Sequence, residues 1–454
     1  MRCPSIRETA ERALFSGTGF SLCSFHFRLP QIKTTQAEAC ATDGMFVVPG
    51  TGKAYDVRDQ RLFKSKFLVT KDHAMKKAAG CDGNHGVSRR TVLQGGLAAA
   101  VTSMGAASKA LLAEPASPAP LPAKTSGVRT IDIHAHYFPQ TFFDLFNEEG
   151  QRYNSEFRMT EKGFTFKTPT ESNGPLPAKF IDLKQRLADM DAQGVAVHAL
   201  SLTGPMVYWA EGEFSHKLAM TWNDGAVAAH LAHPDRFVVL ATLPMLDPDR
   251  AIDEVNRASK LPGVRGVYMG TNVEGRDLDD SLFEPIFARI EALGLPVFLH
   301  PLPPILGGKR LQPFSLTNLV AYPLDTTVCA SHLIFGGVLD RHPNLVIVLP
   351  HAGGSLLNIV GRLDHGWSVI PAAKHSAQTP SAYLHRFMYD TIAHSKPLME
   401  YIISQVGVDR IIMGSDYCFP VGYDRPVENV EELRLSNEQR KMILGGTAAK
   451  LLKI

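Results

Sequence analysis

Beyond residue 128, short runs rich in β-branched residues alternate with segments of helical periodicity. These runs predict eight strands, most of them followed by a helix. They lie at residues 130–136, 195–201, 237–243, 264–269, 296–300, 345–350, 387–391 and 410–415. Alternating strands and helices are typical of parallel α/β structure, and eight such strands can close into a ring. We therefore expect a (β/α)8 TIM barrel over residues 129–454.

Three segments of this region carry further local signals. Segment 179–193 has its apolar residues on one helical face, and Gly194 can end that helix in the left-handed conformation. Residues 137–178 are too long and too rich in Gly, Pro and polar residues for a simple connection. We expect them to form an inserted lobe over the mouth of the barrel. A last helix, 437–452 behind Ser436, should close the barrel.

The segment before the predicted barrel resembles a targeting signal. Ser88-Arg89-Arg90-Thr91-Val92-Leu93-Gln94 precedes a run of Gly, Ala, Leu, Val and Ser that ends at Ala113. Residues 88–113 resemble a twin-arginine export signal, and the proline-rich residues 114–128 resemble a stiff linker. We expect a periplasmic protein. The alternative is a cytoplasmic protein in which Arg89-Arg90 is an ordinary basic pair.

Residues 1–87 precede this signal, although an export signal normally stands at the N-terminus. Met75 would be a natural start. We therefore interpret residues 1–87 as an over-extended start or a disordered leader. Detection of peptides from residues 1–74 in the native protein would contradict this interpretation.

Charge and cysteine content exclude several kinds of protein. With Lys+Arg 47 against Asp+Glu 45, the formal net charge is only +2, so no strong field attracts nucleic acid or an anionic membrane. The apolar run of the export signal is interrupted by Lys109 and is too short to span a bilayer. Of six cysteines only Cys329 and Cys418 lie beyond residue 85, so no disulfide framework is expected. We expect neither a nucleic-acid partner nor a membrane span.

Histidine and aspartate residues stand at the predicted ends of four strands. His134 and His136 lie two residues apart on the first strand, so both imidazoles point to one face and can bind one ion. His300 ends the fifth strand, His351 follows the sixth, and Asp416 follows the eighth. A single histidine is more often structural, but five such residues at one rim favour a metal-dependent site.

Seven motifs occur in a specific order along the predicted barrel. They are Ile131-Asp132-Ile133-His134-Ala135-His136, Asp189-Met190-Asp191-Ala192-Gln193-Gly194-Val195, Arg236-Phe237, Leu243-Pro244, His300-Pro301, His351-Ala352-Gly353-Gly354 and Ser415-Asp416-Tyr417-Cys418-Phe419-Pro420. On these residues the chain resembles the amidohydrolase superfamily, in particular its branch related to aminocarboxymuconate semialdehyde decarboxylase.

This resemblance implies the roles of the rim residues. His134, His136, His300 and Asp416 would bind a divalent ion, with zinc the first expectation and manganese the second, and His351 would be the catalytic acid/base. Superfamily members with two metals use a lysine or glutamate at the end of the fourth strand. That strand contains neither here, so we expect one ion.

The resemblance also implies substrate contacts. Arg362 matches an arginine that a neighbouring subunit contributes to hold a substrate carboxylate, which implies an anionic small-molecule substrate and a homodimer. Trp209 and Phe419 match aromatic positions that could line a flat pocket, although aromatic residues there are core about as often. A second arginine, expected in the inserted lobe, has no counterpart around residues 163–167.

Three functions stay open on the sequence. A divalent ion polarises a substrate oxygen and activates water, and His351 can move a proton because imidazole titrates near neutral pH. The first prediction is a metal-dependent carboxy-lyase that removes carbon dioxide from a small unsaturated or aromatic carboxylic acid. The alternative is a metal-dependent hydrolase that cleaves a lactone, an amide or a C–C bond. The third is a non-catalytic binding barrel, in which His351 would be dispensable.

Overall fold

The computed structural model describes residues 45–47, 54–56, 127–303 and 306–454. It divides into two units, Met1–Glu114 and Pro115–Ile454. In the first unit, strand β1 (Met45–Val47) pairs antiparallel with β2 (Ala54–Asp56). The predicted export signal, 88–113, and residues 114–126 of the predicted linker lie outside the described residues and stay predictions. Among the described helices, none is both long and apolar enough to cross a membrane.

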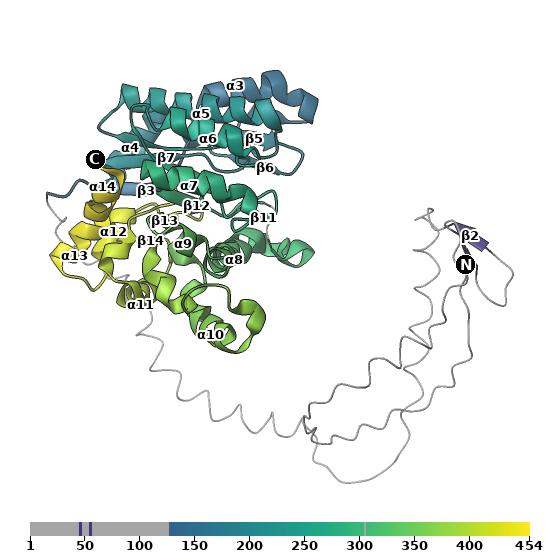
Figure 1. Ribbon diagram of the computed structural model, residues 1–454. Helices are drawn as coiled ribbons and strands as arrows, with labels where there is room; N and C mark the ends of the chain where they lie inside the picture. Colours follow the sequence, from purple (N-terminus) through teal and green to yellow (C-terminus); the bar gives the residue numbers. More distant parts are fainter. Residues whose placement is uncertain (1–44, 48–53, 57–126, 304–305) are drawn as a thin grey trace, which may run out of the picture. The chain divides into compact units, whose positions relative to one another are not determined.

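Eight parallel strands of the second unit form one sheet, and all eight coincide with predicted strands. In order around the sheet they are β3 (Ile131–His136), β7 (Val197–Ser201), β8 (Phe237–Ala241), β9 (Val264–Gly270), β12 (Val297–His300), β13 (Ile347–Leu349), β14 (Phe387–Asp390) and β15 (Ile411–Ile412). Figure 1 shows these strands inside a layer of helices. Because both faces of the sheet are covered, strands such as β8 are buried along their whole length.

The ring is completed where β3 meets the chain that follows β15. The Ile133 amide donates to the Met413 carbonyl at 3.1 Å, and the His136 amide donates to the Tyr417 carbonyl at 2.7 Å. The eighth strand is shorter than the predicted 410–415, because the chain leaves regular pairing before it reaches Asp416. The fold is therefore the expected (β/α)8 barrel, with the first and last strands joined beside two of the predicted ligands.

The helices of the barrel follow the strands as the alternating pattern predicts. They are α4 (Leu183–Gln193), α5 (Gly212–Ala232), α6 (Pro248–Ala258), α7 (Glu284–Leu293), α8 (Tyr322–Phe335), α9 (Val338–Arg341), α10 (Leu356–Val369), α11 (Lys396–Val406), α12 (Pro426–Glu431), α13 (Asn437–Lys441) and α14 (Thr447–Leu452). A short antiparallel pair, β10 (Asn272–Val273) and β11 (Arg276–Asp277), follows β9.

Local capping explains where two of the predicted helices begin and end. Helix α4 begins four residues later than expected, because the Asp182 side chain accepts a hydrogen bond from the Gln185 amide and caps the helix there. Gly194 ends it with φ 70°, in the left-handed conformation that glycine adopts without strain. The Ser436 cap is also confirmed, since Ser436 and Gln439 form a reciprocal capping box.

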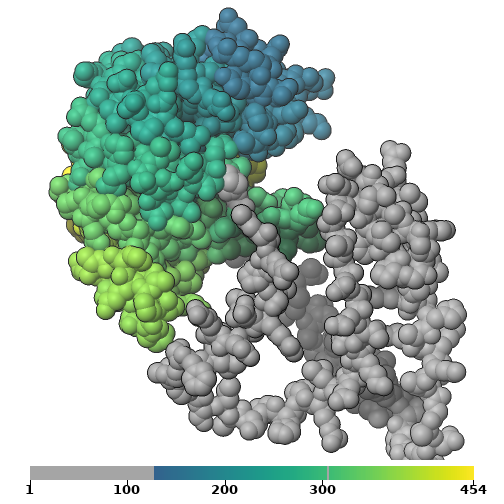
Figure 2. All heavy atoms as spheres, turned by 45° about the vertical axis from the view of Figure 1, so that its right-hand side comes forward, coloured from purple at the N-terminus to yellow at the C-terminus, as the bar shows by residue number. Residues whose placement is uncertain are grey.

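The segment between β3 and α4 forms a lobe of its own. It contains helix α3 (Gln140–Glu149) and an antiparallel sheet of β4 (Glu156–Thr160), β5 (Gly163–Lys167) and β6 (Ser172–Leu176). Figure 2 shows these residues, in blue, gathered on one side of the barrel. The buried Phe164 ring lies 6.0 Å from Phe180, whose ring lies 5.0 Å from Phe419 beside the strand ends. Aromatic packing thus fixes the lobe against the rim of the barrel.

Candidate metal centre

Four of the predicted residues form one compact cluster at the rim. One ligand atom from each of His134, His136, His300 and Asp416 lies within 4.8 Å of the others. All four side chains are buried, with exposures between 0% and 6%. The structure therefore brings together the predicted ligand set from three different segments of the barrel.

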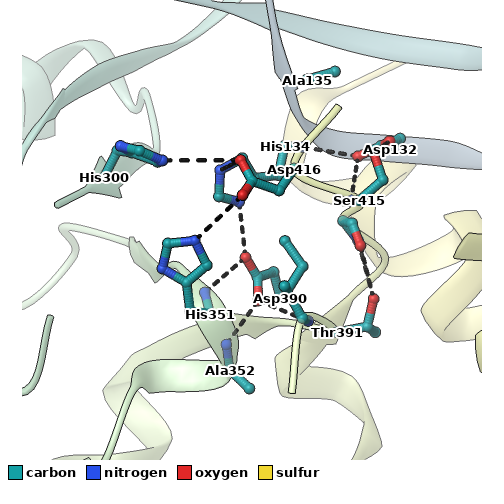
Figure 3. Close-up of polar contacts among 12 residues, drawn as sticks. Asp132, His134, Ala135, His300, His351, Ala352, Asp390, Thr391, Ser415 and Asp416 are labelled. Atoms are coloured by element: carbon teal, nitrogen blue, oxygen red, sulfur yellow. Dashed lines mark hydrogen bonds and ion pairs between the residues drawn. The ribbon is translucent and has the colours of Figure 1, made fainter. Parts of the chain in front are cut away.

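Strand geometry explains how these side chains converge. His134 and His136 share β3, His300 is the last residue of β12, and Asp416 follows β15 with φ 63°. Asp416 Oδ1 lies 3.3 Å from His134 Nε2, 3.0 Å from His136 Nε2 and 4.0 Å from His300 Nε2. Three imidazoles thus face one carboxylate oxygen, and Figure 3 shows the His300 ring directed toward the Asp416 carboxylate.

The hydrogen bonding of His300 fits a bound ion. Both of its ring nitrogens are buried, and neither has a hydrogen-bond partner among the described residues. Burial, followed by the charges of His136 and His134, holds the pKa of His300 well below its usual range, so the ring is neutral and keeps a free lone pair. A buried polar atom without a partner costs about 1–3 kcal/mol. Three imidazole nitrogens and a carboxylate oxygen are ligands that a divalent ion accepts, and the ion would satisfy this lone pair.

Asp390, at the end of β14, orients two of the central side chains. Its Oδ2 accepts hydrogen bonds from His134 Nδ1 and from the His351 amide, both at 2.9 Å, and its Oδ1 accepts one from the Ala352 amide at 2.7 Å (Figure 3). Burial alone would raise the pKa of Asp390, but hydrogen bonding and the charge of His134 hold this pKa below its usual value. The carboxylate therefore keeps Nδ1 of His134 as the donor and leaves Nε2 for the ion.

The same carboxylate holds His351 beside the cluster. His351 and Ala352 have φ values of 51° and 53°, in the left-handed region that residues other than glycine rarely adopt. The bonds from both amides to Asp390 stabilise this turn. They leave His351 Nε2 at 3.8 Å from Asp416 Oδ2. His351 thus lies where the sequence placed it, next to the ligands.

Further buried residues form hydrogen bonds with the backbone or the rings of His134 and His136. Asp132 accepts hydrogen bonds from the His134 amide at 2.9 Å and from the Ser415 amide at 3.1 Å, and so joins the two strands that carry ligands. Ser201 Oγ lies 3.1 Å from His136 Nδ1. The guanidinium of Arg186, which is fully buried, donates to the His136 carbonyl. Asp390, Ser201 and Arg186 are not among the site residues predicted from the sequence.

The predicted substrate contacts are distributed differently from the ligands. Phe419 lines a cavity of about 360 Å³ together with His300 and Asp416, and its ring lies 5.3 Å from His136. Trp209 does not line this cavity, because it packs in the core 4.9 Å from Phe146 and donates to the Met206 carbonyl. Arg362 is exposed on α10 and does not line the cavity of its own chain.

The position of Asp390 predicts how much ion binding depends on it. We expect Asp390→Asn to weaken the affinity for zinc by about 10–100-fold, because the amide no longer fixes the tautomer of His134. Competition with a chromogenic chelator measures this affinity. Asp424→Asn, at an exposed position, is the matched control and should leave the affinity unchanged. Equal affinities in the Asp390 variant and the wild type would show that Asp390 does not support the ion.

Known proteins with similar sequences and folds share this barrel. The chain is 29% identical over 334 residues to the 2-amino-3-carboxymuconate-6-semialdehyde decarboxylase of Dictyostelium discoideum, covering 71% of this chain and 91% of that protein. The 5-carboxyvanillate decarboxylase of Sphingomonas paucimobilis matches with a TM-score of 0.63 and 26% identity, over 72% of this chain and all of that one. A manganese-bound dihydroxybenzoic acid decarboxylase from Polaromonas has the same fold, with a TM-score of 0.59 and 24% identity over 72% of this chain and 97% of that one.

The family assignment rests on the whole barrel, including every ligand of the cluster. The model of the family described as "Amidohydrolase" matches residues 131–454, which is well over half of the chain. This protein therefore belongs to the amidohydrolase family.

Proposed function

We propose that this amidohydrolase is a metal-dependent carboxy-lyase that removes carbon dioxide, without oxidation, from a small aromatic or unsaturated carboxylic acid. The observation that carries the proposal is the position of His351 Nε2, 3.8 Å from Asp416 Oδ2, beside a buried cluster of three imidazoles and one carboxylate. A cavity of about 360 Å³ opens onto this cluster, at the low end of the range of small-molecule sites, about 300–1,000 Å³.

The proposed cofactor is one divalent ion held by His134, His136, His300 and Asp416. Zinc is the first choice and manganese the second, since nitrogen and oxygen ligands suit both. Strand β9 supports a single ion because it contains neither a lysine nor a carboxylate that could bridge two metals. When bound, the ion would supply Lewis acidity that polarises a substrate oxygen.

His351 is the proposed acid. For decarboxylation, a proton must be delivered to the carbon that carries the carboxylate, the bond between them breaks, and its electron pair stays on that carbon as carbon dioxide leaves. An imidazole can donate this proton near neutral pH and recover it from solvent. The bonds from Asp390 hold His351 in place for this transfer. Phe419 and Leu302 place apolar surface along the cavity, which excludes water from the reacting carbon.

The hydrolase alternative uses the same cluster but a different second reactant. It requires water to attack a carbonyl carbon, with His351 as the base. The two compared enzymes above 25% identity are named as decarboxylases, and this favours the carboxy-lyase.

The role of His351 predicts a large loss of activity without loss of the ion. We expect His351→Asn to slow carbon dioxide release by about 10²–10⁴-fold, the usual contribution of a general acid. Mass spectrometry of products from a panel of carboxylated aromatic acids, muconates and lactones measures the reaction, and metal analysis should show unchanged loading. His365→Asn, at an exposed position on α10, is the control. A product that gains water and keeps its carboxylate would contradict the carboxy-lyase.

The exposed position of Arg362 bears on how two subunits could assemble. Arg362 is exposed on α10 and is not among the residues that line the cavity of its own chain. We propose a homodimer in which Arg362 of each subunit reaches the cavity of the other and pairs with an anionic group of the substrate.

Mixing two impaired variants tests this arrangement. Arg362→Ala should raise KM about tenfold or more with the dimer intact, whereas Arg158→Ala, at an exposed lobe position, should not. At substrate well below KM, mixing the Arg362→Ala chains with His351→Asn chains should recover about a quarter of wild-type activity, since half of the randomly formed dimers are mixed and each has one intact site. A monomer by light scattering, or no recovery on mixing, would contradict the proposal.

A further inference from the structure

The inserted lobe contributes a carboxyl group to the cavity that contains the ligands. Glu171 lies directly before β6 and lines the cavity together with Asn173 of the lobe. His300 and Asp416 line the same cavity. The substrate space is therefore bounded by the metal cluster and also by an acidic residue from an element outside the barrel.

Three contacts hold Glu171 in this position. The Glu171 amide donates to Thr168 Oγ1 at 2.9 Å, and the Thr168 amide donates to the Glu171 carbonyl at 2.7 Å, so the turn is closed on both sides. Asn173 Nδ2 donates to Glu171 Oε1 at 3.4 Å. At residue 204, a Cβ would lie 2.8 Å from Glu171 Oε2, so the glycine there leaves room for the carboxyl group.

The charges around the cavity determine what Glu171 can bind. Of the described residues that line it, none is a lysine or an arginine, while Glu171 and Asp416 are both acidic. Burial, together with the nearby charge of Glu274, raises the pKa of Glu171 to about 7, although the hydrogen bond from Asn173 acts to lower it. No described lysine or arginine of the same chain lines the cavity beside Glu171, so this partly desolvated carboxyl group is stabilised by a ligand that donates a hydrogen bond. Above pH about 7, where Glu171 is mostly ionised, it repels a ligand that brings a second carboxylate.

We propose that Glu171 is a specificity-determining residue that accepts a hydrogen bond from a hydroxyl or amino group on the substrate ring and disfavours a second carboxylate at this wall. The substrate class is then a hydroxy- or amino-substituted aromatic acid of about one ring, given a cavity of about 360 Å³. This inference rests on the proposed function, because it names the substrate of the same site.

Binding of unreacted analogues tests the inference apart from catalysis. The probes are benzoate, the three hydroxybenzoates and the three benzenedicarboxylates. Calorimetry at low temperature measures their binding to the zinc-loaded full chain, and thermal shift measures it on the metal-free protein, both at about pH 8, where Glu171 is mostly ionised. We expect at least one hydroxybenzoate to bind wild type about tenfold tighter than benzoate, the effect of one hydrogen bond to a charged group, and the dicarboxylates to bind more weakly than benzoate.

The variants separate the charge of Glu171 from its position. Glu171→Gln should reduce the ratio of hydroxybenzoate to dicarboxylate affinity about tenfold, because it removes the repulsion and weakens the hydrogen bond. Glu161→Gln, exposed on the same lobe, should leave the ratio unchanged. Should Glu171→Gln fail to fold, Gly204→Ala gives the same readout, because its methyl group displaces the carboxyl group without removing its charge.

Two outcomes would overturn the inference. One is a wild-type protein that prefers no hydroxybenzoate over benzoate. The other is an unchanged affinity ratio in the folded Glu171 or Gly204 variant. A changed ratio in a protein that releases no carbon dioxide from any acid would support the role of Glu171 and contradict the proposed carboxy-lyase. Carbon dioxide release with an unchanged ratio would support the carboxy-lyase and contradict the role of Glu171. The two proposals can therefore fail separately.

Discussion

The arrangement of the site depends on the hydrogen bonds that the buried carboxylate of Asp390 accepts. It accepts a hydrogen bond from the ring of His134 and further bonds from the amides of His351 and Ala352. Left-handed backbone at residues other than glycine costs about 1–3 kcal/mol each, and hydrogen bonds to a charged group return about 1.5–3 kcal/mol each. One residue therefore offsets the strain of the turn after β13 and sets the orientation of an imidazole on β3. His351, the proposed acid/base, and the four clustered side chains are held in register by a residue that belongs to neither.

The ligand set was predictable because barrel geometry needs little more than the positions of the strand ends. Residues two apart on β3 face the same side, and the C-terminal ends of parallel strands meet at one rim. His300 and Asp416 therefore had to approach His134 and His136 once the eight strands were located. Asp132 lies within the same strand and accepts a hydrogen bond from the His134 amide, so it supports the first ligand pair.

The supporting residues could not be predicted in the same way. Asp390 ends a strand like many acidic residues, and only the φ values after β13 reveal why a carboxylate is needed there. Arg186 lies on a helix that the sequence pattern predicts to be partly exposed. The side chain of Arg186 is nevertheless fully buried, because its guanidinium reaches the His136 carbonyl. Trp209 resembles a pocket residue in sequence, but its ring packs against α3. Such placements depend on tertiary packing that local pattern does not encode.

The barrel and the lobe each contribute residues to the site. The barrel provides the cluster and His351, whereas the lobe provides Glu171 and is fixed through Phe164, Phe180 and Phe419 to the ring of His136. Barrels of this kind support different substrates through different loops and insertions at the rim, without a change of fold.

X-ray absorption on the zinc-loaded protein can show whether the four clustered side chains hold one ion. We expect one ion per chain by metal analysis, with three imidazole nitrogens and carboxylate oxygen at about 2.0–2.2 Å. Two ions per chain, or a sulfur ligand at about 2.3 Å, would contradict this expectation.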